Sequence, residues 1–150
     1  MTLRMSEKEF KKLTNKNQTL QISSKQNKFK NKKINVDGLC FDSTKEYERY
    51  CELLLQEKSG LISNLRFHHP SDKIILIDDP LVTYIPDFCY DENNQHIVED
   101  FKGFQTKEFI LKKKMIISMI KKDKLDITFR IVKYQDNSFN TTEEYKKNRT

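Results

Sequence analysis

Two carboxylates and one lysine stand in strand-like surroundings in the middle of this 150-residue sequence. Asp87 follows an Ile-Pro pair, and Asp100 and Lys102 belong to the run from Val98 to Gly103. Charged side chains inside apolar strands are costly to bury, so they need a reason. Because side chains alternate along a strand, we expect Asp100 and Lys102 on one face and Glu99 on the other.

This combination of residue types points to metal-assisted chemistry on a phosphate. Two carboxylates a few ångströms apart repel each other unless a cation lies between them, and oxygen ligands without Cys or His suit Mg²⁺ or Mn²⁺. A lysine two residues after the second acid can orient a water molecule or stabilise charge on a phosphate, while the metal polarises the P–O bond. We therefore predict a Mg²⁺ site in which Mn²⁺ can substitute, with no small-molecule cofactor.

The turn between the two strands decides which residues meet Asp87. With a four-residue loop at 91–94, Asp87 pairs with Val98 and lies on the face of Asp100. A five-residue loop would bring Glu99 to Asp87 instead. We favour the four-residue loop because it leaves an apolar face for the core, made of Ile97 and Phe101.

The spacing of an acid and a lysine is weak evidence when it is taken alone. It also occurs at Glu9–Lys11 and Glu144–Lys146, in a chain that is 33% charged. An exposed salt bridge across a hairpin would account for the central acids and lysine without catalysis. His68 and His69 could supply a base or a ligand, but adjacent strand residues point to opposite faces, so at most one could enter the site. For both histidines we favour packing or exposure.

A helix with a further acid is predicted upstream, after a small hairpin over residues 33–41. Ser43 is a suitable N-cap, Glu46 completes the spacing of a capping box, and Ser59-Gly60 ends the helix. Glu46 is therefore either a metal ligand or a capping acid. Arg49 lies one turn later and can pair with Glu46 or contact a phosphate.

The remaining elements follow from hydrophobic periodicity and from turn-forming residues. Strands are expected at 61–68, 73–77, 82–90, 96–102 and 125–134, and a second helix at 106–122. The order is a helix, antiparallel strands, a helix and a strand. This order predicts an α/β protein of the α+β type, with a mixed sheet and helices packed on its faces.

Basic residues exceed acidic ones, giving a formal net charge of +6. Such a surface concentrates polyanions, although solubility alone would also explain the excess. Several lysines are candidate DNA-phosphate contacts, with the solvated face of a helix as the ordinary alternative. The candidates are Lys28, Lys30, Lys32, Lys33, Lys107, Lys112, Lys113, Lys114, Lys121, Lys122 and Lys124.

Both ends of the chain are polar. We expect residues 1–28 to form a basic, flexible arm with one short helix at 6–13, and residues 135–150 to form a polar tail with little to bury. Apolar runs stay far below the roughly 18 residues of a membrane span, so we expect a soluble protein without a membrane partner. The three cysteines form no CxxC pair, which favours a reduced, cytoplasmic chain.

These motifs resemble the PD-(D/E)xK nuclease superfamily, and within it a small phage-encoded family of unknown function. The resembling stretches are residues 29–33, 36–38, 41–43 with Glu46 and Arg49-Tyr50, 83–88, and 98–103 with Thr106-Lys107. The resemblance implies a nuclease domain over residues 29–134. It also implies a restriction-endonuclease-like αβββαβ core, here with an N-terminal β-hairpin.

The resemblance assigns roles to individual residues by their motif positions. It implies that Asp87, Asp100 and Glu46 bind the metal and that Lys102 is catalytic. Glu99 and Arg49 would support them, although a bulge could exchange Glu99 for Asp100 as the ligand.

The resulting expectation is a Mg²⁺-dependent endonuclease that hydrolyses phosphodiester bonds of DNA, in the host cytoplasm if a phage encodes it. Likeness to small resolvase-type nucleases favours branched DNA, such as a Holliday junction or another recombination intermediate. Cutting both strands of a junction would require a homodimer. The alternatives are a nicking, repair or defence-related nuclease, or an inactive DNA-binding accessory protein of the same fold.

Overall fold

A computed structural model of the chain describes residues 21–23 and 32–148. The predicted helix at 6–13 and the candidate phosphate contacts Lys28 and Lys30 lie outside these residues. The chain divides into two compact units, Met1–Lys58 and Ser59–Thr150, and each is described by itself. Neither of the two α-helices in the described residues is long and apolar enough to cross a membrane.

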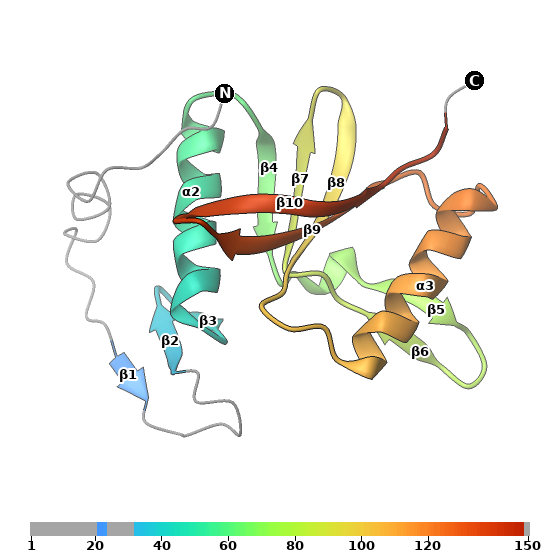
Figure 1. Ribbon diagram of the computed structural model, residues 1–150, viewed down its shortest axis with the longest axis horizontal. Helices are drawn as coiled ribbons and strands as arrows, with labels where there is room; N and C mark the ends of the chain where they lie inside the picture. The colour runs from blue at the N-terminus through green and yellow to red at the C-terminus, as the bar shows by residue number, and fades with distance from the viewer. Residues whose placement is uncertain (1–20, 24–31, 149–150) are drawn as a thin grey trace. The chain divides into compact units, whose positions relative to one another are not determined.

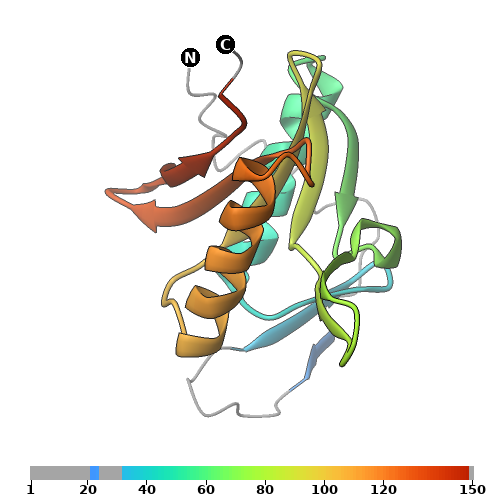
Figure 2. The same ribbon diagram turned by 90° about the vertical axis from the view of Figure 1, so that its right-hand side faces the viewer.

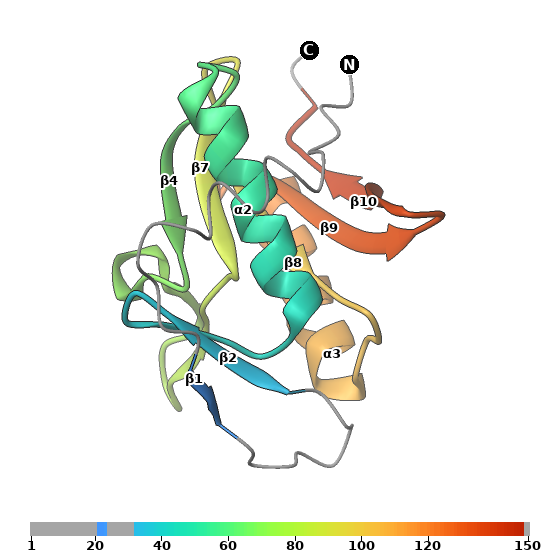
Figure 3. The same ribbon diagram turned by 90° about the vertical axis from the view of Figure 1, so that its left-hand side faces the viewer.

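In its described residues, the first unit contains a three-stranded antiparallel sheet and one helix (Figure 3). Its elements are β1 (Gln21–Ser23), β2 (Lys33–Val36), β3 (Leu39–Phe41) and α2 (Thr44–Lys58). The predicted hairpin and helix are confirmed, but β1 adds a strand inside the segment that was expected to be a flexible arm. Phe41 at the end of β3 packs its ring against Tyr47 and Tyr50 of α2, at centroid distances of 5.2 and 5.3 Å.

The second unit is built on a five-stranded sheet and a two-stranded sheet (Figure 1). Its elements are β4 (Ser63–Phe67), the 3-10 helix η1 (Pro70–Asp72), β5 (Ile74–Ile77), β6 (Val82–Tyr84), β7 (Phe88–Glu92), β8 (Gln95–Phe101), α3 (Lys107–Lys121), β9 (Thr128–Gln135) and β10 (Ser138–Tyr145). The large sheet has the order β10-β9-β8-β7-β4, and β5 pairs with β6. Only the β8–β9 pair of the large sheet is parallel, so the sheet is mixed, as predicted.

Helix α3 connects the parallel strands β8 and β9, which need such a crossover. The Thr106 side chain caps its N-terminus by accepting a hydrogen bond from the Phe109 amide. The buried residues Phe109, Ile116 and Ile120 recur at helical spacing, so one stripe of α3 enters the core. Figure 2 shows α3 running in front of the large sheet of its unit. The core consists of Ile74, Tyr84, Cys89, Val98, Phe109, Ile116, Ile120, Phe129 and Ile131.

The turn between β7 and β8 differs from the predicted four-residue loop. It consists of Asn93 and Asn94 alone, both with positive φ, which suits the two-residue turn of a twisted hairpin. The register pairs Phe88 with Glu99, and one step further it brings Asp87 opposite Asp100. The predicted pairing was therefore wrong by two residues. A shift of two preserves the face, so Asp87 and Asp100 still lie on the same side.

The expected division of β8 into an apolar and a polar face is also corrected. Val98, on the face of Asp100, belongs to the core beside α3. Ile97 on the other face is equally buried. The carboxylate of Asp100 therefore lies at the edge of an apolar core, because both faces of this central strand are covered.

Up to Tyr145, the C-terminal segment belongs to the large sheet and is not the polar tail that the sequence predicts. Residues 138–145 form β10, which pairs antiparallel with β9. Asp136 and Asn137 have positive φ and form the connecting turn. Phe139 stacks its ring edge-on against Tyr134 at 5.0 Å. A tight turn and an aromatic pair thus stabilise β10, which hydrophobic periodicity in the sequence did not predict.

Candidate functional site

The second unit brings Asp87, Asp100 and Lys102 together at one end of the β7–β8 hairpin. The Lys102 Nζ atom lies 2.8 Å from Asp100 Oδ2 and 3.7 Å from Asp87 Oδ2. The Asp87 and Asp100 side chains are 9% and 1% exposed, whereas that of Lys102 is 26% exposed. Two largely buried carboxylates thus converge on one ammonium that reaches solvent.

Asp87 is held in place by the backbone on both sides. It stands in the bend before β7, and its Oδ2 accepts a hydrogen bond of 2.9 Å from the Phe101 amide. Its carbonyl oxygen accepts one of 2.8 Å from the His68 amide, just after β4. Asp87 therefore connects the ends of three strands, which fixes the position of its carboxylate.

Lys102 is positioned by the end of β8 and by α3. Its amide donates a 3.0 Å hydrogen bond to the Val132 carbonyl of β9. Its ammonium lies 4.9 Å from the centre of the Phe109 ring, a cation–π distance. These contacts direct the side chain back over the two carboxylates.

Asp100 is the more deeply buried of the two acids. The Lys102 ammonium is at ion-pair distance from Asp100 Oδ2, but outside hydrogen-bond geometry, so within the described part of the chain this buried oxygen has no hydrogen-bond partner. A buried anionic oxygen with free lone pairs is costly unless a cation occupies them. The oxygen-only donor set fits a hard divalent cation such as Mg²⁺.

Two neighbours of the acids were not selected from the sequence. Tyr84 has a buried hydroxyl that interacts with Asp100, without a hydrogen bond of standard geometry among the described residues. Burial, then the charges of Asp100 and Asp87, raise its pKa well above the usual value, so the hydroxyl stays protonated. The His68 Nδ1 atom lies 3.9 Å from Asp87 Oδ1. Neither residue stands out in the sequence, because a Tyr in a strand is ordinarily a core residue and a strand histidine is ordinarily packed or exposed.

Glu99 lies on the opposite face of β8 from Asp100 and Lys102. Its Oε2 accepts a hydrogen bond from the Tyr90 hydroxyl. The oxygen of that hydroxyl in turn accepts a hydrogen bond from Arg130. Burial alone would lower the pKa of Arg130, but Tyr90 and Glu92 outweigh burial and raise it, so Arg130 stays charged. Of the two candidate ligands in the motif, Asp100 is the one beside Lys102.

Glu46 belongs to the first unit and caps the start of α2, although its carboxylate reaches the amide of Asp42 and not that of the predicted N-cap residue Ser43. Its amide donates to Ser43 Oγ at 3.1 Å, and its Oε2 accepts from the Asp42 amide at 2.7 Å. Arg49 pairs with Glu52, with 3.5 Å between Nη1 and Oε2. The capping role of Glu46 is therefore observed, and its role as a metal ligand stays a prediction.

The candidate phosphate contacts differ in how far they are engaged. Lys113 donates to Gln105 and Glu143 at 2.7 and 2.8 Å, which makes it a structural residue of α3 and β10. Lys112 pairs with Glu108 at 2.9 Å. The exposed candidates are Lys32, Lys107, Lys114, Lys121, Lys122 and Lys124. Lys33 is half-buried and pairs with Asp42 at 3.3 Å.

The fold and site define a mixed α+β protein with paired buried carboxylates at the end of a central hairpin. Residues 26–136 match the model of a family described as "Protein of unknown function (DUF1064)", so the chain belongs to that family. Nothing matches the chain among curated proteins or among solved structures.

Proposed function

We propose that this protein is a Mg²⁺-dependent endonuclease that hydrolyses phosphodiester bonds of DNA. Its active site would contain Asp87, Asp100 and Lys102. The observation that carries the proposal is the convergence of two buried carboxylates on one partly exposed ammonium. Asp100 Oδ2 is buried and pairs with the Lys102 ammonium at 2.8 Å, without a hydrogen bond of standard geometry in the described residues.

The order of the elements supports a restriction-endonuclease-like core. Helix α2, the strands β4, β7 and β8, helix α3 and strand β9 follow one another in the αβββαβ order that the resemblance implies. The β5–β6 pair stands as an insertion between β4 and β7. Within the second unit, β9 continues the sheet next to β8 in the parallel direction.

Asp87 and Asp100 would hold the Mg²⁺ ion, and Mn²⁺ could replace it because it accepts the same oxygen ligands. The bound ion supplies a Lewis acid that activates water and polarises the P–O bond. The Phe101 amide keeps Asp87 oriented, and the packed sheet keeps Asp100 in place. This preorganisation limits the reorganisation that each turnover needs.

Lys102 would act on the phosphate or on the attacking water. Its ammonium can orient the water or stabilise the negative charge that develops on the phosphate oxygens. Contact with the Phe109 ring keeps the charged end near the acids. His68 adds a second nitrogen beside Asp87 that could exchange a proton with bulk solvent, since its side chain is 55% exposed.

We propose branched DNA as the substrate, cut by a homodimer. The basic excess and the exposed lysines Lys107 and Lys114 support binding to a polyanion. Within this function, Arg49 and Lys32 of the first unit are further candidate phosphate contacts. A nicking, repair or defence-related nuclease would use the same residues on another DNA structure.

The test is cleavage of labelled four-way junction, linear duplex and single-stranded DNA, in Mg²⁺ or in EDTA, by the parent and by Asp100→Asn. The amide keeps the shape of the side chain and removes its charge. We expect Mg²⁺-dependent cutting of the junction by the parent only. Cutting of all three DNAs would support nuclease activity but would assign the protein to repair or degradation of DNA instead of junction resolution. Binding without cutting, in both Mg²⁺ and Mn²⁺, would identify an accessory protein and overturn the proposal.

A further inference from the structure

A second group of metal-ligating side chains lies on the same face of the large sheet, toward the other end of the β7–β8 hairpin. It contains Asp72 from η1, Cys89 from β7 and His96 from β8, whose candidate ligand atoms all lie within 4.8 Å of one another. The strand register places Cys89 and His96 on the face that carries Asp100. The oxygen site proposed above uses none of the three.

His96 is held by a carboxylate, as metal-bound histidines often are. Its Nδ1 lies 3.0 Å from Asp91 Oδ1, and the other oxygen of Asp91 accepts a 2.7 Å hydrogen bond from Asn64. The hydrogen bond from Asn64, and then the one from His96, lower the pKa of Asp91, so this carboxylate is ionised at neutral pH. A carboxylate that holds Nδ1–H fixes the tautomer and leaves Nε2 with a free lone pair.

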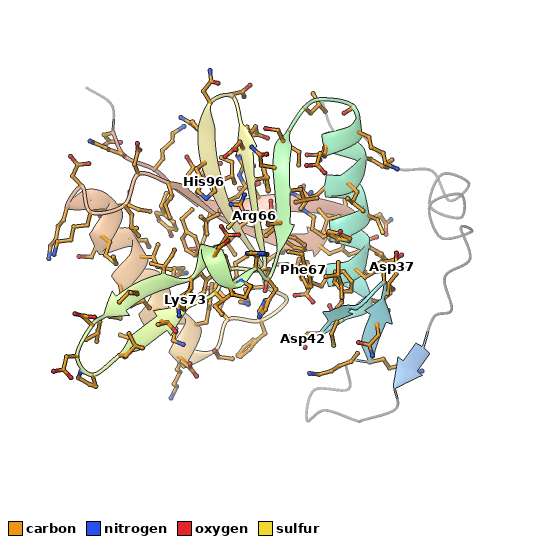
Figure 4. All side chains as sticks on the ribbon, turned by 180° about the vertical axis from the view of Figure 1, so that it is seen from behind. Asp37, Asp42, Arg66, Phe67, Lys73 and His96 are labelled. Atoms are coloured by element: carbon orange, nitrogen blue, oxygen red, sulfur yellow. The ribbon has the colours of Figure 1, made fainter. Side chains whose placement is uncertain are left out.

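Asp72 is also held in place by hydrogen bonds. Its two oxygens accept hydrogen bonds of 2.8 and 2.7 Å from Nε and Nη2 of Arg66. Burial alone would raise the pKa of Asp72, but Arg66 outweighs it and lowers the pKa, so the group is an anion. Each carboxylate oxygen has two lone pairs, so both can accept from Arg66 and still offer one to a cation. Figure 4 labels Arg66 and His96 near η1, on the side of the unit that faces the viewer.

The donor set selects a type of metal. Thiolate sulfur, imidazole nitrogen and carboxylate oxygen together suit Zn²⁺ and related borderline ions, whereas Mg²⁺ takes oxygen ligands. Neighbouring ligand atoms around tetrahedral Zn²⁺ are about 3.3–3.8 Å apart, given Zn–ligand distances of about 2.0–2.3 Å. The three ligand atoms, which lie within 4.8 Å of one another, would therefore need to approach by up to about 1.5 Å to reach this geometry.

Cys89 sets the conditions under which a metal could bind. It is 1% exposed, so a metal would reach the sulfur only from the side of Asp72 and His96, whose candidate ligand atoms lie within 4.8 Å of it. His96 itself reaches the surface, since it lines a pocket of about 640 Å³ that is also bordered by Asp91 and Asn93.

We propose that Asp72, Cys89 and His96 form a three-ligand site for Zn²⁺, with the fourth coordination position left to water. Such an ion would fasten η1, the segment that follows β4, to the β7–β8 hairpin. Asp91 acts as a positioning residue through His96. The inference does not depend on the proposed nuclease activity, because it uses other residues and another class of metal.

The test is a titration of the untagged, reduced, metal-free full-length protein with Co²⁺, which reports sulfur ligation by a charge-transfer band and tetrahedral geometry by its visible bands. We expect both features in the parent, their displacement by Zn²⁺ and no displacement by Mg²⁺. Cys89→Ser should remove the charge-transfer band, whereas Cys40→Ser, at an exposed cysteine of the first unit, should retain it. Ions bound by Asp87 and Asp100 alone would give no sulfur band.

Two further variants keep the test informative if Cys89→Ser fails to fold. His96 is partly exposed, so His96→Gln should fold and should lower Zn²⁺ affinity at least tenfold in a chelator competition. Asp91→Asn should lower it about 10- to 100-fold, as expected when the partner of a histidine ligand is lost. A parent without a sulfur band, a band that survives Cys89→Ser, or an affinity unchanged in His96→Gln would overturn the proposal.

Discussion

At the scale of single residues, the central feature is that Asp100 combines deep burial with an incompletely satisfied charge. Its side chain is 1% exposed and has one ion-pair partner at 2.8 Å. Asp87, by contrast, accepts a backbone hydrogen bond. Functional sites commonly keep such local conflicts between stability and chemistry. The conflict makes Asp100 the residue at which a structural salt bridge and a metal site predict different behaviour.

Asp100→Asn should therefore leave the metal-free protein about as stable as the parent, within about 1 kcal/mol, because the substitution removes a poorly solvated charge next to Asp87. Mg²⁺ or Mn²⁺ should raise the melting temperature of the parent and not that of the variant. The measurement is thermal unfolding with and without each ion. A loss of about 3–5 kcal/mol in the absence of metal would instead identify a structural ion pair.

The sequence predicted these residues well and their neighbours poorly. Alternation along a strand placed Asp100 and Lys102 on one face, and a two-residue error in register left Asp87 on that face as well. Tyr84 could not be predicted, because its strand β6 pairs with β5 and approaches the acids only through tertiary packing. The capping role of Glu46 was predictable since its contacts are local in sequence.

At the scale of elements, β10 is the largest difference from the sequence prediction. Its residues are mostly polar, so no hydrophobic alternation marked it. Its place is secured by pairing with β9 and by contacts to α3. Glu143 accepts hydrogen bonds from Lys113, Gln105 and Tyr145. The contacts with Lys113 and Gln105 join residues 30 and 38 positions apart, so they leave no signal in a local window.

Glu143 should make the stability of this strand depend on pH. Burial alone would raise its pKa, but Lys113, Gln105 and Tyr145 outweigh it and lower the pKa from 4.5 to about 2. A lowered pKa contributes stability that is present above about pH 4.5 and is lost as the pH falls toward 2. Glu143→Gln should therefore lower the free energy of unfolding at pH 7 by about 1 kcal/mol, and by much less near pH 2.

Urea unfolding followed by circular dichroism between pH 2 and pH 7 measures this effect. Glu108→Gln is the matched control, since Glu108 pairs with Lys112 on the surface and is 77% exposed. It should change stability little at any pH. Equal losses for the two variants at pH 7 would contradict the role given to Glu143.

At the scale of the whole molecule, the excess of basic residues is interpreted as a DNA-binding surface. The formal net charge of +6 alone does not distinguish DNA binding from solubility. The structure narrows the choice of residues, because Lys113 is engaged internally while Lys107 and Lys114 are exposed on α3. Charge could be counted from the sequence, but the engagement of each lysine required the tertiary structure.

Replacing both Lys107 and Lys114 by Ala should weaken DNA binding and reduce its dependence on salt. Each lost phosphate contact lowers the slope of log K against log salt by about 0.9, so the pair should reduce it by about 2. Fluorescence anisotropy at several salt concentrations gives the slope. Lys73→Ala is the control, because Lys73 is also exposed but is not among the candidate contacts. Equal slopes for parent and double variant would remove α3 from the DNA-binding surface.

The measurement that tests the central claim most directly is single-turnover cleavage of a labelled four-way junction in Mg²⁺ by the parent, Lys102→Met and Lys73→Ala. Methionine retains an apolar stem over Phe109 and removes the ammonium from the two acids. The account predicts cutting by the parent and by Lys73→Ala, and a rate about 10²- to 10³-fold lower for a folded Lys102→Met. Cutting by Lys102→Met at the parent's rate would contradict the assignment of the active site.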